Sequence, residues 1–497
     1  MTLIFRFLFL AFCFFSPFGQ AQISPNLERA YEEIGKMKIG LGQQYLAKEK
    51  KANSPLNNAF AVYVENYADL ITLLVSDDPQ LLAQLAPRQD QRLDALEKLP
   101  ENEPYRRFLK AEIRLHWAFV KLKFGKEMSA SWDIIKAYKL LDENAKKFPD
   151  FLPTYKSLGL LHVLIGSTPQ NYQWVAKLLG LRGNIQQGLR EVQRVITNDS
   201  LFKAEAQLIE ILLHAYVLKY SEKQNQELLQ LLHSQPDNLL LQFFGVTVSM
   251  KDGRGEQALQ LLENRPRGAA YLPFPFLDYL RAEILLQKGQ YLTAETQLNG
   301  FLLRYKGQNF LKDAYLKLFL CNWLNNNDVA AQKYLQKLVN VGQTVVESDK
   351  AAQQFAENFL KGKVLVSQKI LMKARLAFDG GYLDTALQIL KPLTETTFAN
   401  PRDRAEFSYR LGRIYQRRNE PDLAIVCFDR AVALSAVEHY YFGATAALQL
   451  GYIYQIKNQK NKAIGAFRQA LNYPKHEYKN STDNKARAAL TEMGVTD

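Results

Sequence analysis

Residues 411–431 read LGRIYQRRNEPDLAIVCFDRA, and residues 450–470 read LGYIYQIKNQKNKAIGAFRQA. Both stretches follow the pattern L-G-x-I-Y-Q-x-x-N and then A-I-x-x-F-x-x-A, with no gap between the two copies when they are aligned. In each half, apolar residues recur every three to four positions, which places them on one face of a helix. A polar turn separates the halves. The repeated stretch is therefore predicted to be a helical hairpin.

Each copy has a glycine in the middle of its first helix. In the first copy this is Gly412, and glycine at such a position costs about 1 kcal/mol relative to alanine. The cost is tolerated where another helix packs closely, and Ala424 supplies a matching small residue on the second helix. We expect Tyr415 and Phe428 to wedge the two helices together, and the second copy repeats the arrangement.

The hairpin resembles the tetratricopeptide repeat (TPR), which has L-G and Y on its first helix, A, F and A on its second, and a proline near its end. The matching residues are Leu411, Gly412, Tyr415, Ala424, Phe428 and Ala431, then Leu450, Gly451, Tyr454, Ala463, Phe467 and Ala470, with Pro474 after them. Ser408 and Ala447 replace the usual large residue before L-G, and the period is 39 rather than 34 residues. The resemblance implies stacked hairpins.

Looser hairpins precede these two units. Their apolar positions are Ala137 and Leu141; Tyr155, Leu158 and Gly159; Tyr279, Ala282 and Leu285; Ala294, Leu298 and Phe301; and Ala374, Ala386 and Leu390. No run of alternating residues predicts a strand. We therefore predict an all-α fold of helical-hairpin repeats stacked as a right-handed TPR-like superhelix. The predicted parts are an N-terminal helical segment (22–100), divergent repeats (101–400), two clear TPR units (401–473) and a capping segment (474–497).

Two segments interrupt the repeats, an insertion near residues 166–188 and a proline-rich stretch before residue 277. Both resemble a divergent TPR family of eukaryotes that includes an outer-mitochondrial inclusion-body clearance protein. The matching residues are Thr168, Pro169, Leu178, Leu179, Gly180, Gly183, Asn184 and Gly188, then Pro273, Phe274 and Pro275, with Leu181 and Phe276 departing from the family pattern. The resemblance implies a scaffold role linked to lipid handling or aggregate clearance.

The first 21 residues, MTLIFRFLFLAFCFFSPFGQA, are typical of a secretory signal peptide cleaved after Ala21. The apolar run after Arg6 is too short to cross about 30 Å of hydrocarbon, which disfavours a membrane anchor. The bulky Phe12 before Cys13 disfavours lipidation at that cysteine. No later stretch is expected to be long and apolar enough to span a bilayer. We expect an exported protein of the periplasm or cell envelope.

The formal net charge of +13 suggests an acidic partner. A basic chain can bind nucleic acid, but export removes most nucleic acid from reach, so a protein or peptide partner or an anionic membrane surface is expected instead. Without the signal peptide the chain keeps Cys321 and Cys427, which lie in separate helical stripes. They are predicted to be buried thiols rather than a disulfide.

Catalytic signatures are missing from the sequence. It contains no H-E-x-x-H, C-x-x-C or G-x-S-x-G motif, and its six histidines are scattered singly. His162 lies in an apolar helical run, where a core histidine is favoured over a ligand. We therefore predict no catalytic residue, no metal and no cofactor. An enzyme would need distant His, Asp or Glu residues to converge in one pocket.

A binding surface is predicted on the concave wall, which the first helices of stacked hairpins line. The inward residues of the two clear units are Tyr409, Arg413, Gln416, Arg417, Tyr452 and Gln455. Arg413 and Arg417 are one turn apart, and arginine forks suit carboxylates, so an acidic or C-terminal peptide fits. A solvated charged face is the alternative. Arg413 stands where the chaperone-tail clamp of some TPR proteins has Asn, which disfavours that ligand.

Trp174 is a second candidate contact because it lies in the insertion, on a short amphipathic helix predicted over 172–179. A continuous apolar groove around Trp174 would favour a lipid or glycan carrier, whereas a wall of Arg and Tyr would favour peptide binding. The sequence thus predicts a non-catalytic exported scaffold that binds a protein or peptide on its concave surface, and a carrier of the cell envelope is the alternative.

Overall fold

The computed structural model describes residues 23–49, 54–168, 174, 176–362, 367–438, 440–474, 476 and 478–495. Within these ranges the regular secondary structure is helical throughout, which confirms the predicted all-α fold. The predicted signal peptide lies outside the described residues.

The chain forms two parts, which we call the N-terminal arc (α1 to α19) and the C-terminal arc (α20 to α26). The N-terminal arc contains α1 (Pro25–Gly35), α2 (Ile39–Glu49), α3 (Pro55–Ser76), α4 (Pro79–Leu85), α5 (Arg88–Leu96), α6 (Pro104–Lys123), α7 (Glu127–Lys147), α8 (Pro153–Gly166), α10 (Ile185–Asn198), α11 (Lys203–Tyr216), α12 (Glu222–Ser234), α13 (Leu239–Lys251), α14 (Gly255–Glu263), α15 (Phe276–Gln287), α16 (Tyr291–Arg304), α17 (Leu311–Leu324), α18 (Asp328–Asn340) and α19 (Glu347–Leu360). The C-terminal arc contains α20 (Gln368–Asp379), α21 (Leu383–Leu390), the short 3₁₀ helix η1 (Glu395–Thr397), α22 (Pro401–Arg417), α23 (Pro421–Leu434), α24 (Tyr441–Ile456), α25 (Lys460–Asn472) and α26 (Lys479–Glu492).

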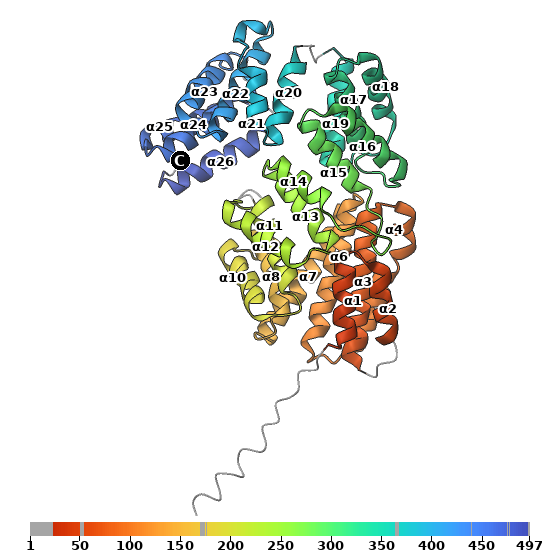
Figure 1. Cartoon of the computed structure of the whole chain (residues 1–497). Coiled ribbons are helices and arrows are strands. Elements are labelled where there is room, and N and C mark those ends of the chain that lie inside the picture. Colours follow the sequence, from red (N-terminus) through yellow and green to blue (C-terminus); the bar gives the residue numbers. More distant parts are fainter. Residues whose placement is uncertain are drawn as a thin grey trace, which may run out of the picture.

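Neighbouring helices pack in pairs, as the repeat pattern predicts. The hairpins are α6/α7, α8/α10, α11/α12, α13/α14, α15/α16, α17/α18, α20/α21, α22/α23 and α24/α25. First helices also contact the first helices of adjacent hairpins, so they form a continuous inner layer. In Figure 1 the C-terminal arc lies above α8–α12, and α15–α19 lie above α1–α6. This arrangement confirms a TPR-like superhelix of helical hairpins.

The mid-helix glycines of the two clear units sit against aromatic rings. A Cβ atom on Gly412 would lie 2.6 Å from the ring of Phe428, and one on Gly451 would overlap the ring of Phe467. The close partner is thus the phenylalanine rather than the small Ala424. The ring that stacks beside Phe428 belongs to Tyr409, at 6.0 Å between centroids, while Tyr415 packs at the edge of the same cluster.

Replacing Gly451 by alanine should destabilise the C-terminal arc by about 1–3 kcal/mol, because the added methyl group overpacks the contact with Phe467. Gly465 is the matched control: it lies inside α25 with no atom within 4 Å of an added Cβ. Gly465→Ala should stabilise the arc by about 0.4–1 kcal/mol. Urea unfolding of both variants measures the difference, and two changes of the same sign would contradict the packing.

Asparagine and proline set the helix ends. Asn419 and Asn458, the N of the repeated L-G-x-I-Y-Q-x-x-N pattern, have left-handed backbone angles (φ 62° and 58°) that end α22 and α24. At the other end of α22, the side chain of Asn400 accepts from the backbone N–H of Arg402 at 2.8 Å, and Pro401 occupies the first helical position. These local signals explain why the hairpin turns fall where the sequence places them.

The α8/α10 hairpin stays intact around the inserted segment because glycines at both ends of the segment allow close backbone contacts. A Cβ on Gly159 of α8 would lie 2.7 Å from the carbonyl oxygen of Gly188 on α10, so the two backbones touch. A Cβ on Gly183 would overlap the backbone of Gly166. Asn184 then caps α10 by accepting from the N–H of Gln187 at 2.9 Å. The glycines that mark the insertion in the sequence therefore serve close helix packing.

The N-terminal helices fill the inside of the N-terminal arc and close it. Tyr31 of α1 packs on Phe202 at the start of α11, with ring centroids 5.6 Å apart. The turn after α1 is held by the N–H of Leu272, which donates to the carbonyl oxygen of Met37 at 2.8 Å. The largest hydrophobic core has residues from Ile23 to Ala356, and a separate small core lies within α11–α13 of the same arc. The C-terminal arc has smaller cores of its own.

Asp77 joins the α3–α4 turn to the α16–α17 loop. It is 1% exposed, and its carboxylate accepts from the hydroxyl of Tyr305 at 2.8 Å and from the backbone N–H of Asn309 at 2.9 Å. The side-chain amide of Asn309 donates to the same carboxylate at 3.0 Å. A single buried side chain thus ties residues more than 200 positions apart.

Among the described residues, α3 is long and apolar enough to cross a membrane by length and composition. The expectation that no stretch after the signal peptide passes this test was therefore wrong. In the fold, 56% of the most apolar window of α3 is buried against other helices. Tyr63 and Phe60 of α3 are fully buried, so α3 serves here as a core helix.

Candidate functional site

Arginines gather on the inner wall of the C-terminal arc, where α20, α22 and α24 lie side by side. They are Arg375 on α20 and Arg402, Arg410, Arg413 and Arg417 on α22. Glu406 lies between Arg402 and Arg410 and forms ion pairs with both. Burial, together with the nearby charge of Glu406, raises the pKa of Tyr441 on α24. The wall is therefore rich in Arg and Tyr.

Arg413 and Arg417, which we call the arginine pair, share one aromatic platform. Their guanidinium carbons lie 5.4 and 5.7 Å from the ring centroid of Phe378 on α20. Arg413 also donates to the hydroxyl of Tyr409 at 3.1 Å, and Arg417 donates to the carbonyl oxygen of Asp252 at 3.1 Å. Stacking on a ring stabilises a guanidinium without neutralising its charge.

The arginine pair is not neutralised. Among the described residues, neither guanidinium forms an ion pair with a carboxylate, and the Nε of Arg413 is buried without a hydrogen-bond partner. Two carboxylates of the neighbouring elements are paired with other arginines: Asp252 with Arg254 at 2.6 Å and Asp379 with Arg375 at 3.5 Å. Two adjacent positive charges with unused donors are suited to an oxyanion such as a carboxylate.

The inner charges of the N-terminal arc are used internally. Lys156 of α8 pairs with Glu112 of α6 at 2.6 Å, and Lys317 of α17 pairs with Glu283 of α15 at 3.8 Å. These pairs join consecutive first helices and occupy both lysines. In the C-terminal arc, by contrast, Arg413 and Arg417 form no ion pair within the described residues.

The other predicted wall residues contribute differently. Tyr409 packs on Phe442 with ring centroids 5.7 Å apart, and Tyr452 packs on Phe467 at 5.3 Å. Gln416 and Gln455 are half-buried on α22 and α24. The described contacts bring Tyr409 to the arginine pair, but they do not bring Gln416, Tyr452 or Gln455 there.

Sequence reasoning missed two parts of the wall, Phe378 and the charged stripe of Arg402, Glu406 and Arg410. Phe378 was missed because it belongs to another hairpin, and no local pattern links it to α22. Arg402, Glu406 and Arg410 carry a usable signal, since they are four residues apart and continue toward the arginine pair on one helix. A search for charged stripes on first helices would have found them.

Trp174 is 64% exposed and Leu178 is 77% exposed, so the insertion presents apolar side chains to solvent. Residues 172, 173 and 175 of the predicted short helix lie outside the described residues. Neither of the two cavities described below is lined by Trp174. Trp174 is thus exposed to solvent, and neither of these cavities forms an apolar groove around it within the described residues.

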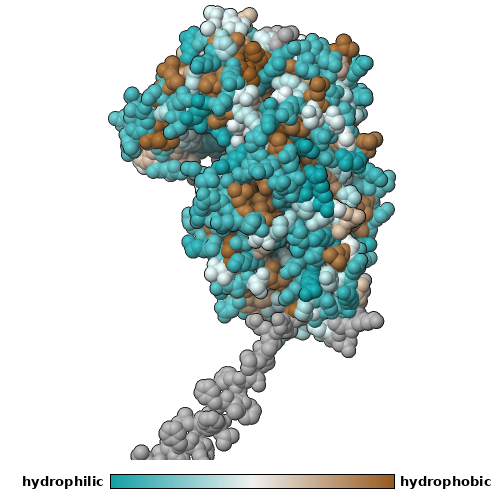
Figure 2. Space-filling model, viewed as in Figure 1, coloured by the Kyte–Doolittle hydropathy of each residue, from teal (hydrophilic) through white to brown (hydrophobic). Residues whose placement is uncertain are grey.

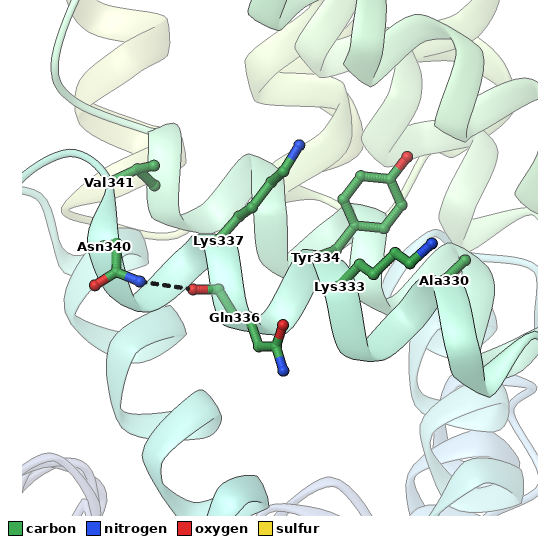
Figure 3. Close-up of a pocket in the computed structure, with 7 residues that line it drawn as sticks. All are labelled: Ala330, Lys333, Tyr334, Gln336, Lys337, Asn340 and Val341. Carbon is green, nitrogen blue, oxygen red and sulfur yellow. Dashed lines mark hydrogen bonds between the residues drawn. The ribbon is translucent and has the colours of Figure 1, made fainter.

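A hollow of about 550 Å³ lies on α18, and its lining contains no cluster of catalytic side chains (Figure 3). Its lining residues are Ala330, Lys333, Tyr334, Gln336, Lys337, Asn340 and Val341, all from one helix and its end. Figure 3 shows Tyr334 and Lys337 on the same side of the helix, while Gln336 points away. A second cavity of about 240 Å³ lies beside Asp77.

A titratable cluster inside the N-terminal arc has two buried members, Lys156 and Glu112, and one partly exposed member, Glu205. Lys156 is fully buried and bonds to Glu112 at 2.6 Å and to Glu205 at 2.8 Å. Tyr31 covers Glu205 by donating its hydroxyl to it. Burial and the charge of Glu205 raise the pKa of Glu112, whereas Lys156 holds the pKa of Glu205 low despite burial. α1 covers Glu205 in part through Tyr31, and the Glu205 side chain remains 25% exposed.

His116 is a buried neutral base in the same region. Its Nδ1 lies 3.0 Å from the amide nitrogen of Asn66, and the rings of Tyr63 and Tyr67 lie 5.6 and 5.5 Å away. Burial, with the charge of Lys156, lowers the pKa of His116 from 6.5 to about 3. His162, predicted to be a core histidine, is 6% exposed and bonds to Glu191 at 2.6 Å.

His116 should make the protein less stable in acid. Between pH 6.5 and pH 3 the unfolded chain protonates this imidazole and the native chain does not, so the free energy of unfolding falls as the pH falls. From pH 7 to pH 4 we expect a loss of about 3 kcal/mol from this residue. His116→Gln keeps an acceptor for Asn66 without the titration. Equal pH slopes for the variant and the natural protein in urea unfolding would contradict the assignment.

Among the described residues, no group of three or more His, Cys, Asp or Glu side chains is placed to hold a metal ion. Cys321 and Cys427 are both free thiols, and Cys321 is buried as predicted, whereas Cys427 is only half-buried because it lies beside, rather than within, the buried stripe of α23. Burial raises the pKa of Cys321 to about 12 and that of Cys427 to about 11, so both remain protonated near neutral pH.

A notch separates the two arcs in the space-filling view. Figure 2 shows it at the left, between the C-terminal arc and the part of the N-terminal arc around α10–α12, on a face that is mostly hydrophilic. Beside the notch, the α13–α14 turn touches the α20–α21 turn. There the N–H of Gly255 donates to the carbonyl oxygen of Gly380 at 2.9 Å. Asp252 of the same turn receives the hydrogen bond from Arg417.

No protein-family model matches the sequence, and no curated protein matches it. Three similar solved structures are the human IFIT1 dimer with PPP-AAAA (13% identity, 91% of this chain and 95% of that chain, TM-score 0.32), the TPR domain of P58(IPK) (14%, 87% and 99%, 0.21) and the APC/C hetero-tetramer Cut9–Hcn1 (12%, 94% and 97%, 0.22). These TM-scores carry no inference about this chain. The stacked hairpins of its described residues define it as a TPR-like helical-repeat protein.

Proposed function

We propose that this repeat protein is a non-catalytic scaffold that binds an acidic segment of a protein partner on the inner wall of its C-terminal arc. The observation that supports the proposal most strongly is the arginine pair, which has unused donors and no carboxylate partner among the described residues. Tyr409 and Phe378 provide aromatic surface beside it. Arginine and tyrosine are residues that interfaces favour.

Fluorescence anisotropy with a labelled peptide tests the proposal. The probe contains four Glu, two Phe and two Gly, and the comparison peptide has Lys in place of each Glu. The mature chain should bind the acidic peptide, and the double variant Arg413→Glu, Arg417→Glu should lose at least about tenfold in affinity, because each reversal replaces attraction by repulsion.

Lys333→Glu with Lys337→Glu is the matched control. This pair has the same four-residue spacing and the same change of charge, but it lies exposed on α18, away from the inner wall. The control should bind as the natural chain does at 0.15 M salt, where distant exposed charges are screened. If both double variants lost the same affinity for the peptide, the loss would come from the change in net charge. The inner wall would then be rejected as the binding site.

The alternative of a lipid or glycan carrier is supported by the exposure of Trp174 and Leu178. Such a carrier needs a continuous apolar groove around Trp174, and the described cavities do not include it. The Arg- and Tyr-lined wall therefore favours a peptide. Binding of a fluorescent fatty acid that Trp174→Ala abolishes would favour the carrier instead.

The proposal places the protein outside the cytoplasm, in the periplasm or cell envelope, on the strength of residues 1–21. A fusion of these residues to a reporter enzyme that is active only after export should show activity outside the cytoplasm. A reporter with Arg6 and the apolar run deleted is the control, and equal activity of the two would remove the support for export.

A further inference from the structure

One contact between the two arcs is made by backbone atoms of two glycine turns. Gly255 N–H donates to the carbonyl oxygen of Gly380 at 2.9 Å. Gly253 and Gly381 have left-handed backbone angles (φ 68° and 81°), and a Cβ atom on Gly381 would overlap the carbonyl oxygen of Gly253. Only glycine allows this approach. We call this contact the glycine latch.

The glycine latch occupies part of the arginine pair. Arg417 donates to the carbonyl oxygen of Asp252, and its guanidinium lies so close to Gly253 that an added Cβ would be 2.5 Å from one of its nitrogens. Arg413, one turn earlier, keeps a buried Nε without an acceptor. The latch thus gives Arg417 a neutral carbonyl oxygen as its acceptor. A carboxylate would give the arginine pair a charged oxygen in the same place.

We infer that the glycine latch competes with the acidic partner, so that binding of carboxylates to Arg413 and Arg417 is coupled to release of the Asp252 turn. The inference rests on the proposed function. A carboxylate is a stronger acceptor for a guanidinium than a neutral carbonyl group, and a bidentate pair uses two of its donors. A ligand that binds the unlatched state better shifts the population toward that state.

Outside the glycine latch the arcs are joined by other contacts, including Lys288 over the ring of Tyr382 at 6.0 Å. The main helix contacts that connect them are those of α20 with α15 and α17. These contacts are independent of the hydrogen bond between Gly255 and Gly380. Release of the latch therefore widens the notch between the arcs without removing α20 from its neighbours.

Gly381→Ala provides the test, because the added methyl group cannot coexist with the latched backbone. Gly289→Ala is the matched control: Gly289 has the same left-handed conformation (φ 83°) in the α15–α16 turn, with no atom within 4 Å of an added Cβ. Both variants carry the same backbone strain, but only one disrupts the latch. With the Glu-rich peptide used above, Gly381→Ala should bind at least about fivefold more tightly than Gly289→Ala.

Hydrogen exchange of the Gly255 amide gives a second readout that needs no variant. Its N–H should exchange faster in the natural chain when the acidic peptide is added, and faster in Gly381→Ala without peptide. Unchanged or weaker peptide binding by Gly381→Ala, or slower exchange of Gly255 on binding, would overturn the coupling. If the natural chain binds the peptide and the latch variants do not differ, the coupling alone fails. If no form binds the peptide, the proposed function fails too.

Discussion

Replacement of Lys156 by methionine should lower the free energy of unfolding by about 3–5 kcal/mol, because it leaves buried carboxylates without their cation. Lys156 is 0% exposed, and its ammonium group bonds to Glu112 at 2.6 Å and to Glu205 at 2.8 Å. It also lies 5.2 Å from the centroid of the Phe202 ring. Methionine has a similar length, so the loss of charge dominates over the loss of volume.

The effect should depend on pH in a defined direction. Without Lys156, Glu112 must be protonated to stay buried, so the variant gains relative stability as the pH falls toward the ordinary pKa of a carboxyl group. Lys146→Met is the matched control, since Lys146 is 74% exposed in a surface pair with Asp142. It should leave urea unfolding unchanged. A loss below about 1 kcal/mol for Lys156→Met would mean that water reaches the cluster.

Replacement of Asp77 by alanine should cost about 3–5 kcal/mol by the same kind of measurement. The carboxylate satisfies the hydroxyl of Tyr305 and the backbone N–H of Asn309, and each buried donor left without an acceptor costs about 1–3 kcal/mol. Asp77 also has φ 53°, a left-handed conformation that alanine adopts at a cost of about 1–2 kcal/mol.

Two comparisons separate these contributions. Asp77→Asn keeps a side chain that tolerates the left-handed conformation and one acceptor oxygen, so it should lose less than Asp77→Ala. Asp384→Ala removes an exposed carboxylate that pairs with Arg418 and should change little. If Asp77→Ala and Asp77→Asn lose the same stability, the hydrogen bonds to Tyr305 and Asn309 contribute nothing beyond the charge.

The hairpins were predictable because their signals are local. Gly412 and Phe428 lie sixteen residues apart and meet within one hairpin, and the αL residue Asn419 marks the turn between the helices they occupy. The position of α1 was not predictable. Its Tyr31 meets Phe202 and Glu205, and no periodicity in the sequence specifies a contact over such a separation.

The candidate site was predictable in part. Spacing placed Arg413 and Arg417 on one helical face, and the structure brings them together on Phe378. Spacing could not show that Asp252, from a turn far earlier in the chain, bonds to Arg417. It also treated Tyr452 as a wall residue, although its ring packs on Phe467 within its own hairpin. Whether such a residue lines the wall or packs within its own hairpin depends on the direction of its side chain.

The placement of α1 inside the N-terminal arc has a consequence for how the chain gains and loses structure. A linear repeat array can fray from either end, one unit at a time. Here the first helix is bound to residues near 202 and 272, so the early repeats cannot melt singly without exposing it. The helices that share the large core with α1 should therefore unfold as one cooperative block, whereas α11–α13 and the later hairpins, which have separate cores, should unfold at lower denaturant.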